Sequence, residues 1–418
     1  MKASGEINRW AVWALLVSVF AFCSCSTSPR IEVVPQQQGT IVFTSARALS
    51  NSDAPNAATN IWAMNADGTN AHGLTQLTAT GASSADPVWS PDGKKIAYTS
   101  MRALNGSNAA IGAVNIWVMN ADGSGSIPLS TLTTTLVSSM HAAWSPDSSK
   151  VAYDSTRAIE GYNMAGNVTN IWSVNADGTG STLLTALRFA PSVFPDWSPD
   201  GTKILFTSSR SLAGFDIEIG INNIWVMNSD GTNPQPLTKS LITPSSQAVW
   251  SPDGKKIAFV STRSLSLADV NIGAANLWVM NADGSSPTPL THLTGPYNMM
   301  PDLPVWSPDG SKIAYVSSRA VDGSNVGGTV LNVWVTNSDG SGNRALTALE
   351  AAKSYEPSWS SDGSKVVYCS TRSLDGTDSP NANVTWNIWI TSNTGVGTTA
   401  LTRSTAANAD SAGPQWAH

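Results

Sequence analysis

A triplet of Asn, then Ile, Leu or Val, then Trp returns seven times along this chain at nearly constant spacing. Its tryptophans are 53 to 56 residues apart and are Trp62, Trp117, Trp172, Trp225, Trp278, Trp334 and Trp389. A second series, Trp-Ser-Pro-Asp-Gly and its variants, has Trp89, Trp144, Trp197, Trp250, Trp306 and Trp359, and ends in a partial copy at Trp416. A fixed period of this length, built from short β-prone runs, is typical of a radial array of small sheets.

Each repeat contains four segments that favour β-strands. In the second copy, residues 87–90 and 95–100 flank a Pro-Asp-Gly turn, in which Pro presets the first dihedral and Gly accepts the left-handed one. Residues 115–120 and 128–130 flank a second turn, Ala-Asp-Gly. Four antiparallel strands in one repeat make one blade of a propeller.

The two ends of the repeat region complement each other. The first strand segment, residues 41–45, has no Trp-Ser-Pro-Asp-Gly segment before it, and the missing strand stands at the other end, in residues 413–417. We therefore expect an all-β fold, a seven-bladed β-propeller of four-stranded blades closed by N- and C-terminal strands that share one blade. Such closure removes the open sheet edges that favour aggregation.

The first residues are typical of an export signal. Lys2 and Arg9 precede an apolar run at 10–22, which is too short to span a bilayer. Ser24 and Cys25 after this run resemble the lipobox of bacterial lipoproteins, which implies cleavage after Ser24 and lipid attachment at Cys25. Cys23 as the lipid site, or an ordinary cleaved signal, stays open. The expected domains are a lipoprotein signal peptide at 1–24, a polar tether at 25–38 and the propeller at 39–418.

The repeat also resembles a known family. The run W-S-P-D-G-K-K-I-A-Y-T-S, followed by I-W-V-M-N-A-D-G and L-T, is similar to the TolB-like propeller repeats of bacterial envelope proteins over roughly residues 40–418. TolB carries a separate α/β domain before a six-bladed propeller, whereas this sequence has a tether there and seven repeats. The resemblance implies a relative in fold that is not TolB itself.

An arginine ends the second strand segment of every repeat. These residues are Arg47, Arg102, Arg157, Arg210, Arg263, Arg319 and Arg372. Six positions after each arginine there is an Asp or Asn. One interpretation is a ring of arginines that binds an anion. The other is structural: each guanidinium binds its own insert, including backbone carbonyls and the Asp or Asn six residues on.

Apolar side chains gather in only some of the loops. The candidates for partner binding are Tyr162, Met164, Phe189, Phe194, Phe215 and Ile217 in and between the third and fourth repeats, and Tyr297, Met299 and Met300 between the fifth and sixth. Exposed apolar clusters often mark protein contacts. The alternative is that these side chains bury one another under the longer loops.

No linear catalytic or metal-binding motif is present. The four histidines occupy unrelated positions in their repeats, and we expect neither a metal site nor a cofactor. His141, Asp196 and Glu356 stand beside inner-strand tryptophans and could approach the mouth of a central channel. With 12% charged residues and a net charge of −6, nucleic acid is not an expected partner.

These observations favour a non-catalytic cell-envelope lipoprotein that acts as a binding scaffold. We expect a monomer that binds an envelope protein or a cell-wall or glycan ligand and contacts the membrane only through its lipid anchor. The expected location is the periplasmic side of the outer membrane or the cell surface. The alternative is a propeller enzyme, a hydrolase or lyase acting on saccharide or peptide fragments with residues that converge at the channel.

Overall fold

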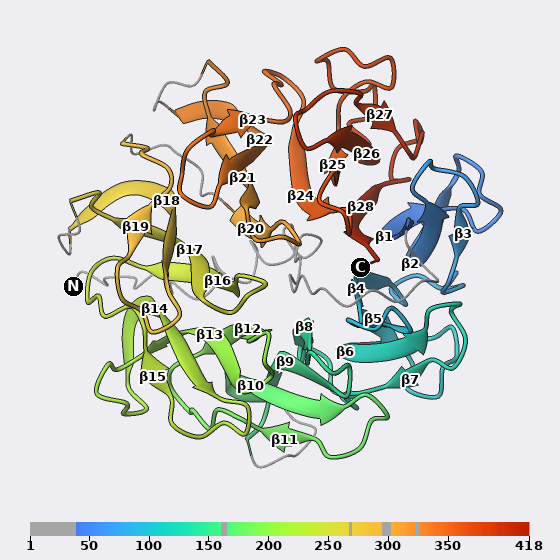
Figure 1. Ribbon diagram of the computed structural model, residues 1–418. Coiled ribbons are helices and arrows are strands. Elements are labelled where there is room, and N and C mark those ends of the chain that lie inside the picture. The colour runs from blue at the N-terminus through green and yellow to red at the C-terminus, as the bar shows by residue number, and fades with distance from the viewer. Residues whose placement is uncertain (1–38, 160–164, 267–269, 295–301, 323–326, 418) are drawn as a thin grey trace, which may run out of the picture.

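The computed structural model describes residues 39–159, 165–266, 270–294, 302–322 and 327–417. Within them the chain forms seven four-stranded antiparallel sheets arranged as a ring of blades (Figure 1), which confirms the predicted fold. None of the described residues forms a helix with the length and apolarity needed to span a bilayer.

The blade that closes the ring combines both ends of the repeat region. Its order from the axis outward is β28 (Ser411–Trp416), β1 (Thr40–Arg47), β2 (Pro55–Asn65) and β3 (His72–Gly73). Ile41 pairs with Trp416, the Oγ atoms of Ser45 and Ser411 are 2.9 Å apart, and the N–H of Ala417 donates to the carbonyl oxygen of Thr40. The predicted sharing of one blade by the two terminal strands is therefore confirmed.

The other six blades repeat this plan, with strands named here from the axis outward. The inner strands are β4 (Ser84–Trp89), β8 (Ser139–Trp144), β12 (Ser192–Trp197), β16 (Ser245–Trp250), β20 (Asp302–Trp306) and β24 (Ser354–Trp359). The second strands are β5 (Lys95–Arg102), β9 (Lys150–Arg157), β13 (Lys203–Arg210), β17 (Lys256–Arg263), β21 (Lys312–Arg319) and β25 (Lys365–Ser370). The third strands are β6 (Ala110–Asn120), β10 (Ala165–Asn175), β14 (Glu218–Asn228), β18 (Asn271–Asn281), β22 (Gly327–Asn337) and β26 (Asn387–Ser392). The outer strands are β7 (Ile127–Pro128), β11 (Thr182–Leu183), β15 (Gln235–Pro236), β19 (Thr288–Pro289), β23 (Arg344–Ala345) and β27 (Thr399–Ala400).

The repeated tryptophans join neighbouring blades. Trp144 donates its indole N–H to the carbonyl oxygen of Val88 in the preceding blade at 3.1 Å, and Trp359 bonds to Val305 in the same way at 3.0 Å. Each large ring is buried between two sheets, where an aromatic side chain gains most from leaving water. Apolar residues of adjacent blades thus form shared core clusters, and the ring behaves as one packed body.

The two faces of the disc differ in their loops. One, the turn face, carries the short turns that join inner to second strands and third to outer strands. In these turns the Asp side chain accepts hydrogen bonds from residues of its own turn, as Asp92 does from Ser90 and Lys94. The other, the insert face, carries the longer inserts between second and third strands and the connections between blades.

A turn-face glycine sits close to the neighbouring blade. Gly231 has φ +87°, and a Cβ there would lie 2.7 Å from the carbonyl oxygen of Leu184. The residue must therefore be glycine both for its left-handed conformation and for its contact with the preceding blade.

Candidate functional site

The seven repeated arginines pack on tryptophans of their own blades. The distance from the guanidinium carbon to the ring centroid runs from 4.0 Å for Arg102 over Trp117 to 5.8 Å for Arg263 over Trp278. Arg102 also donates from Nη2 to the Tyr98 hydroxyl at 2.7 Å. Such cation–π contacts attach each insert to its blade and favour the structural interpretation. Anion binding by this ring stays a prediction.

The Asp or Asn six residues after the arginine reaches across the boundary between two blades. Asp216 accepts hydrogen bonds from the backbone N–H groups of Arg188 at 2.6 Å and Phe189 at 3.2 Å. Burial lowers the pKa of Arg210 and the nearby Asp216 carboxylate opposes that shift, so this position also interacts with its own arginine. Arg210 donates from Nη2 to the carbonyl oxygen of Gly214 at 2.6 Å, as the structural interpretation expects. Asp216 reaches across the boundary because the connection between blades offers backbone donors that would otherwise lack partners. The equivalent acceptors are Asp53, Asn108 and Asp378.

An apolar surface lies on the insert face over blades three to five. Phe189, Phe215 and Ile217 are 64%, 65% and 59% exposed, and Asp216 holds their two loops together. Leu241 and Ile242, in the next connection, are also exposed. We call these five residues the apolar arc. Sequence reasoning found three of them and missed Leu241 and Ile242, although their position in the repeat matches that of Arg188 and Phe189.

The other candidates for partner binding do not belong to this arc. Phe194 lies on the inner strand β12, half-buried, with its ring centroid 4.2 Å from that of His141. Phe194 thus packs against His141 of the preceding blade, and its part in partner binding stays a prediction. Tyr162, Met164, Tyr297, Met299 and Met300 lie outside the described residues, as does Cys25.

The inner strands surround the axis of the ring and share one unusual backbone feature. They contact one another in an unbroken circle from β4 to β28 and back to β4. Three residues before the inner-strand tryptophan the backbone adopts a left-handed conformation, and the pairing with the second strand shifts there. The residues with this conformation are Asp86, His141, Phe194, Gln247, Glu356 and Gly413, with φ from 52° to 59°.

His141, on the inner strand β8, contacts a carboxylate. Its Nδ1 lies 2.6 Å from Oδ2 of Asp154 on the second strand of the same blade, and that oxygen also accepts the backbone N–H of Phe194 at 3.0 Å. Burial alone would lower the pKa of His141, but the Asp154 carboxylate and, farther away, Asp86 raise it above its ordinary value. The bonded Nδ1 leaves Nε2 without a protein partner among the described residues.

Two acids near the inner-strand tryptophans have structural partners. Glu356 is 1% exposed and accepts the backbone N–H of Gly413 at 2.6 Å, which joins blade seven to the closing blade. Asp196 accepts the N–H of Trp250 across the next boundary at 2.9 Å. Burial, then the Glu356 carboxylate 3.3 Å away, raises the pKa of the Cys369 thiol well above its usual range. This thiol is thus unsuited to act as a nucleophile near neutral pH.

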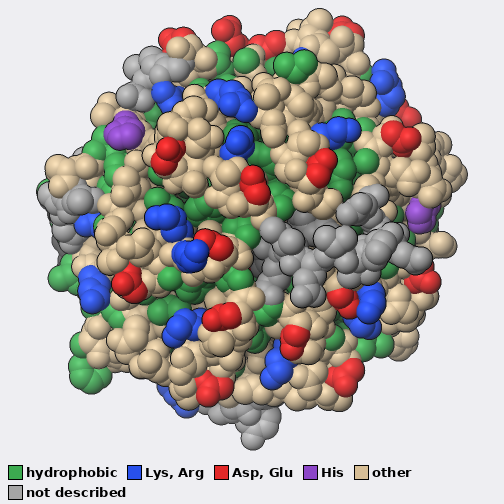
Figure 2. Space-filling model, in the orientation of Figure 1, with side chains coloured by type: hydrophobic (Ala, Val, Ile, Leu, Met, Phe, Trp, Pro, Cys, Tyr) green, Lys and Arg blue, Asp and Glu red, His purple; other side chains and the backbone are tan. Residues whose placement is uncertain are grey.

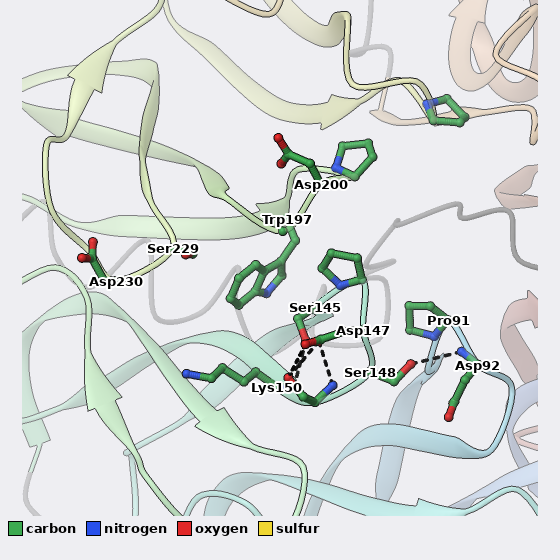
Figure 3. A pocket seen from close by; sticks show the side chains of 15 residues that line it. Pro91, Asp92, Ser145, Asp147, Ser148, Lys150, Trp197, Asp200, Ser229 and Asp230 are labelled. Atoms are coloured by element: carbon green, nitrogen blue, oxygen red, sulfur yellow. Dashed lines mark hydrogen bonds between the residues drawn. The ribbon is translucent and has the colours of Figure 1, made fainter.

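A cavity of about 720 Å³ opens on the turn face among the first turns of blades two to five. Figure 3 shows Trp197 above Asp147 and Lys150, with the backbone N–H of Asp92 bonded to Ser148. Asp147 already accepts hydrogen bonds from Ser145 and Ser149 within its own turn. The carboxylates of this cavity therefore serve to shape turns.

Charge on the surface is mixed in sign. Figure 2 shows Lys and Arg side chains interspersed with Asp and Glu over the face in view. Neighbouring pairs such as Lys94 with Asp92, 3.7 Å apart, account for part of this alternation. Among the described residues no group of three or more His, Cys, Asp or Glu side chains could hold a metal ion.

Curated relatives match this chain only in part. A protein of Agrobacterium fabrum without an assigned function is 32% identical over 177 residues, which cover 41% of this chain and 53% of the relative. The Tol-Pal system protein TolB of Anaeromyxobacter dehalogenans is 33% identical over 130 residues, 31% of this chain and 25% of TolB. The chain thus spans about half or less of the length of the relatives it matches. No family model matches it.

Solved structures share the fold at low identity. TolB from Acinetobacter baumannii aligns with a TM-score of 0.50 at 18% identity, covering 86% of this chain and 79% of that one. An oligogalacturonate lyase in complex with manganese gives 0.52 at 14% identity, covering 83% and 95%. A puromycin-hydrolysing peptidase of Mycobacterium tuberculosis gives 0.59 at 13% identity, covering 92% of this chain and 54% of the peptidase. At these identities the likeness establishes a propeller and leaves the activity open.

Proposed function

From the premise that this chain is a TolB-like β-propeller but not TolB itself, we propose that it is a rigid, non-catalytic binding scaffold of the bacterial cell envelope. In this proposal the protein is exported and carries a lipid on Cys25, which places the propeller on the periplasmic side of the outer membrane or at the cell surface. Its partner is another envelope protein.

The apolar arc is the observation that carries this proposal. Its five large side chains are each more than half exposed, although burial of such a side chain from water is worth about 1.5–3 kcal/mol. The two hydrogen bonds that Asp216 accepts from the connection fix the loops that present Phe189 and Phe215. A preorganised apolar surface loses little conformational freedom on binding, and this favours a protein partner over a glycan.

The geometry of the disc supports a tethered scaffold. Strand β1 begins at Thr40, which pairs with Asn65 beside a turn-face loop, so the chain enters the propeller from the turn face. The arc lies on the opposite, insert face. A lipid anchor upstream of residue 39 would then hold the turn face toward the membrane and leave the arc facing away from it.

Site-specific photo-crosslinking in cells of the source bacterium tests this function. We expect a crosslinker placed at Ile217 to capture a defined envelope protein, and the double variant Phe189→Ser and Phe215→Ser to abolish that adduct while the melting temperature is kept. The matched control is Val396, which is 72% exposed in a turn-face loop of blade seven. Equal capture from positions 217 and 396, or capture unaffected by the double variant, would refute the assignment.

A second candidate function is enzymatic, and the His141–Asp154 pair is the observation that favours it. A carboxylate bonded to Nδ1 fixes the imidazole tautomer, which suits Nε2 for proton transfer to a bound substrate. Hydrolase or lyase activity on saccharide or peptide fragments that disappears in His141→Gln, with binding retained, would establish it. Activity unchanged by this substitution would exclude His141 as the catalytic group.

A further inference from the structure

The cavity on the turn face has the volume of a ligand site. Its volume of about 720 Å³ lies within the roughly 300–1,000 Å³ that ligand pockets occupy. A second cavity of about 500 Å³ adjoins it, since Pro199 and Asp200 line both. The pair, named here the turn-face cavity, therefore extends over the first turns of blades two to five.

Negative charge predominates among the residues that line the turn-face cavity. The charged residues around its larger part are Asp92, Asp147, Asp200, Asp230 and Lys150. Asp92 has Lys94 as a partner 3.7 Å away. Even when Lys150 is counted against the other three aspartates, an excess of negative charge remains, and this favours a cationic ligand.

Neutral donors keep these carboxylates ionised. Burial alone would raise the pKa of Asp200, but hydrogen bonds from Ser198 and Thr202 of the same turn lower it below its ordinary value. Hydrogen bonds from Thr232 likewise lower the pKa of Asp230. Because these donors carry no charge, the bonds fix the position of each carboxylate and leave its negative charge in place.

Two tryptophans add buried hydrogen-bond donors to the turn-face cavity. Three of the inner-strand tryptophans donate their indole N–H groups to carbonyl oxygens of the preceding blade, namely Trp144, Trp306 and Trp359. Trp197 and Trp250, which line the two parts of the cavity, make no such bond within the described part of the chain, although they are only 5% and 4% exposed. Figure 3 shows the Trp197 indole between the turns that carry Asp147 and Asp200. A buried donor without an acceptor costs free energy, so a ligand that supplies an acceptor is favoured.

We propose that the turn-face cavity binds a basic peptide segment of another protein. Lysine or arginine side chains of such a segment supply the positive charge that the aspartates favour, and its backbone carbonyl oxygens supply acceptors for the indole N–H groups. Four proline rings also line the cavity and offer apolar contact to the aliphatic stems of these side chains; they belong to Pro91, Pro146, Pro199 and Pro252. A polyamine would provide the charge without the acceptors. The site lies on the face opposite the apolar arc, so this proposal does not depend on the proposed scaffold function.

Isothermal titration calorimetry on the full chain tests the site. The probes are N-acetyl-tetralysine amide, N-acetyl-tetraglutamate amide, and spermine, which matches the charge of the lysine peptide. We expect the lysine peptide to bind saturably at low ionic strength, and added salt to weaken its binding because exposed charges are screened. The glutamate peptide should not bind, and spermine should bind about tenfold more weakly than the lysine peptide, the loss of roughly one hydrogen bond.

Paired variants separate this site from the overall charge of the chain. Asp200→Asn with Asp230→Asn removes one carboxylate from each turn of blade four, while the amide oxygens still accept the turn bonds. This double variant should weaken binding of the lysine peptide about fivefold. The matched control is Asp309→Asn with Asp339→Asn, which changes the same two turns in blade six, away from the residues that line the cavity, and should bind as the wild type does. An unchanged melting temperature would verify the fold of both variants.

Three results would overturn the proposal. The first is the absence of saturable binding by the lysine peptide. The second is an equal loss of affinity in the two double variants, which would show that the peptide responds only to the net charge of the chain. The third is spermine binding as tightly as the lysine peptide, which would show that the indole donors take no part.

Discussion

Removal of strand β28 tests whether the ring is one cooperative unit. Trp416 is only 5% exposed and packs with Ile41 and Val367 in the core shared by the closing blade and blade seven. Replacing a buried aromatic residue by alanine costs about 3–5 kcal/mol, which is the expected loss for Trp416→Ala. Such a loss is a large part of the roughly 5–15 kcal/mol that stabilises a typical protein.

Truncation after Asp410 should cost more than this single substitution. It also removes the hydrogen bonds of Ser411 with Ser45, Gly413 with Glu356, Trp416 with Ser358 and Ala417 with Thr40. At about 1 kcal/mol for each bond, the total loss is roughly 8 kcal/mol, and the carboxylate of Glu356 is left buried without that donor.

Equilibrium denaturation in urea, followed by tryptophan fluorescence, measures both losses. The control is Phe189→Ala, which removes an aromatic side chain that is 64% exposed and should change the free energy of unfolding by less than about 0.5 kcal/mol. If the truncated protein unfolded at the same urea concentration as the wild type, the ring would not depend on this closure and the reasoning would be refuted.

Three further outcomes follow from particular contacts. Arg102→Ala should lower stability by about 2 kcal/mol, because it removes the packing on Trp117 and the bond to Tyr98, whereas the exposed Lys94→Ala should be neutral in the same denaturation assay. The pKa of His141 is raised in the folded state, so its protonation stabilises the fold fully below the unfolded pKa of about 6.5, and this stabilisation is lost as the pH rises through the folded pKa. The melting temperature should therefore fall less steeply with pH across this window in His141→Gln than in the wild type. Parallel curves for the two proteins would contradict the pairing. Gly231→Ala should lower the melting temperature more than Gly93→Ala, because both glycines have positive φ but only a Cβ at 231 would meet a neighbouring backbone, so equal losses would disprove the role of that contact.

The repeat in the sequence determined the architecture. The turns of Pro-Asp-Gly and Ala-Asp-Gly are local patterns that act through short-range backbone preferences. The number of blades follows from the number of repeats, which two tryptophan series mark at constant spacing. The closure follows from a strand that is missing at one end of the repeats and present at the other. They were sufficient for the strand order, the number of blades and the closure by β28. Three members of the apolar arc were found in the same way, as departures of one loop from its counterparts.

The neighbours of the inner-strand residues and the role of the Asp and Asn residues in the inserts were decided only by the tertiary structure. Asp86, His141, Phe194 and Gln247 are about 55 residues apart in sequence, and they stand on adjacent inner strands only because the ring brings every inner strand to one axis. Asp216 bonds to Phe189 because neighbouring blades, not neighbouring residues, supply the unpaired backbone donors. Spacing along the chain specifies the contents of a blade, whereas contacts between blades depend on how the sheets pack, and no local pattern encodes that packing.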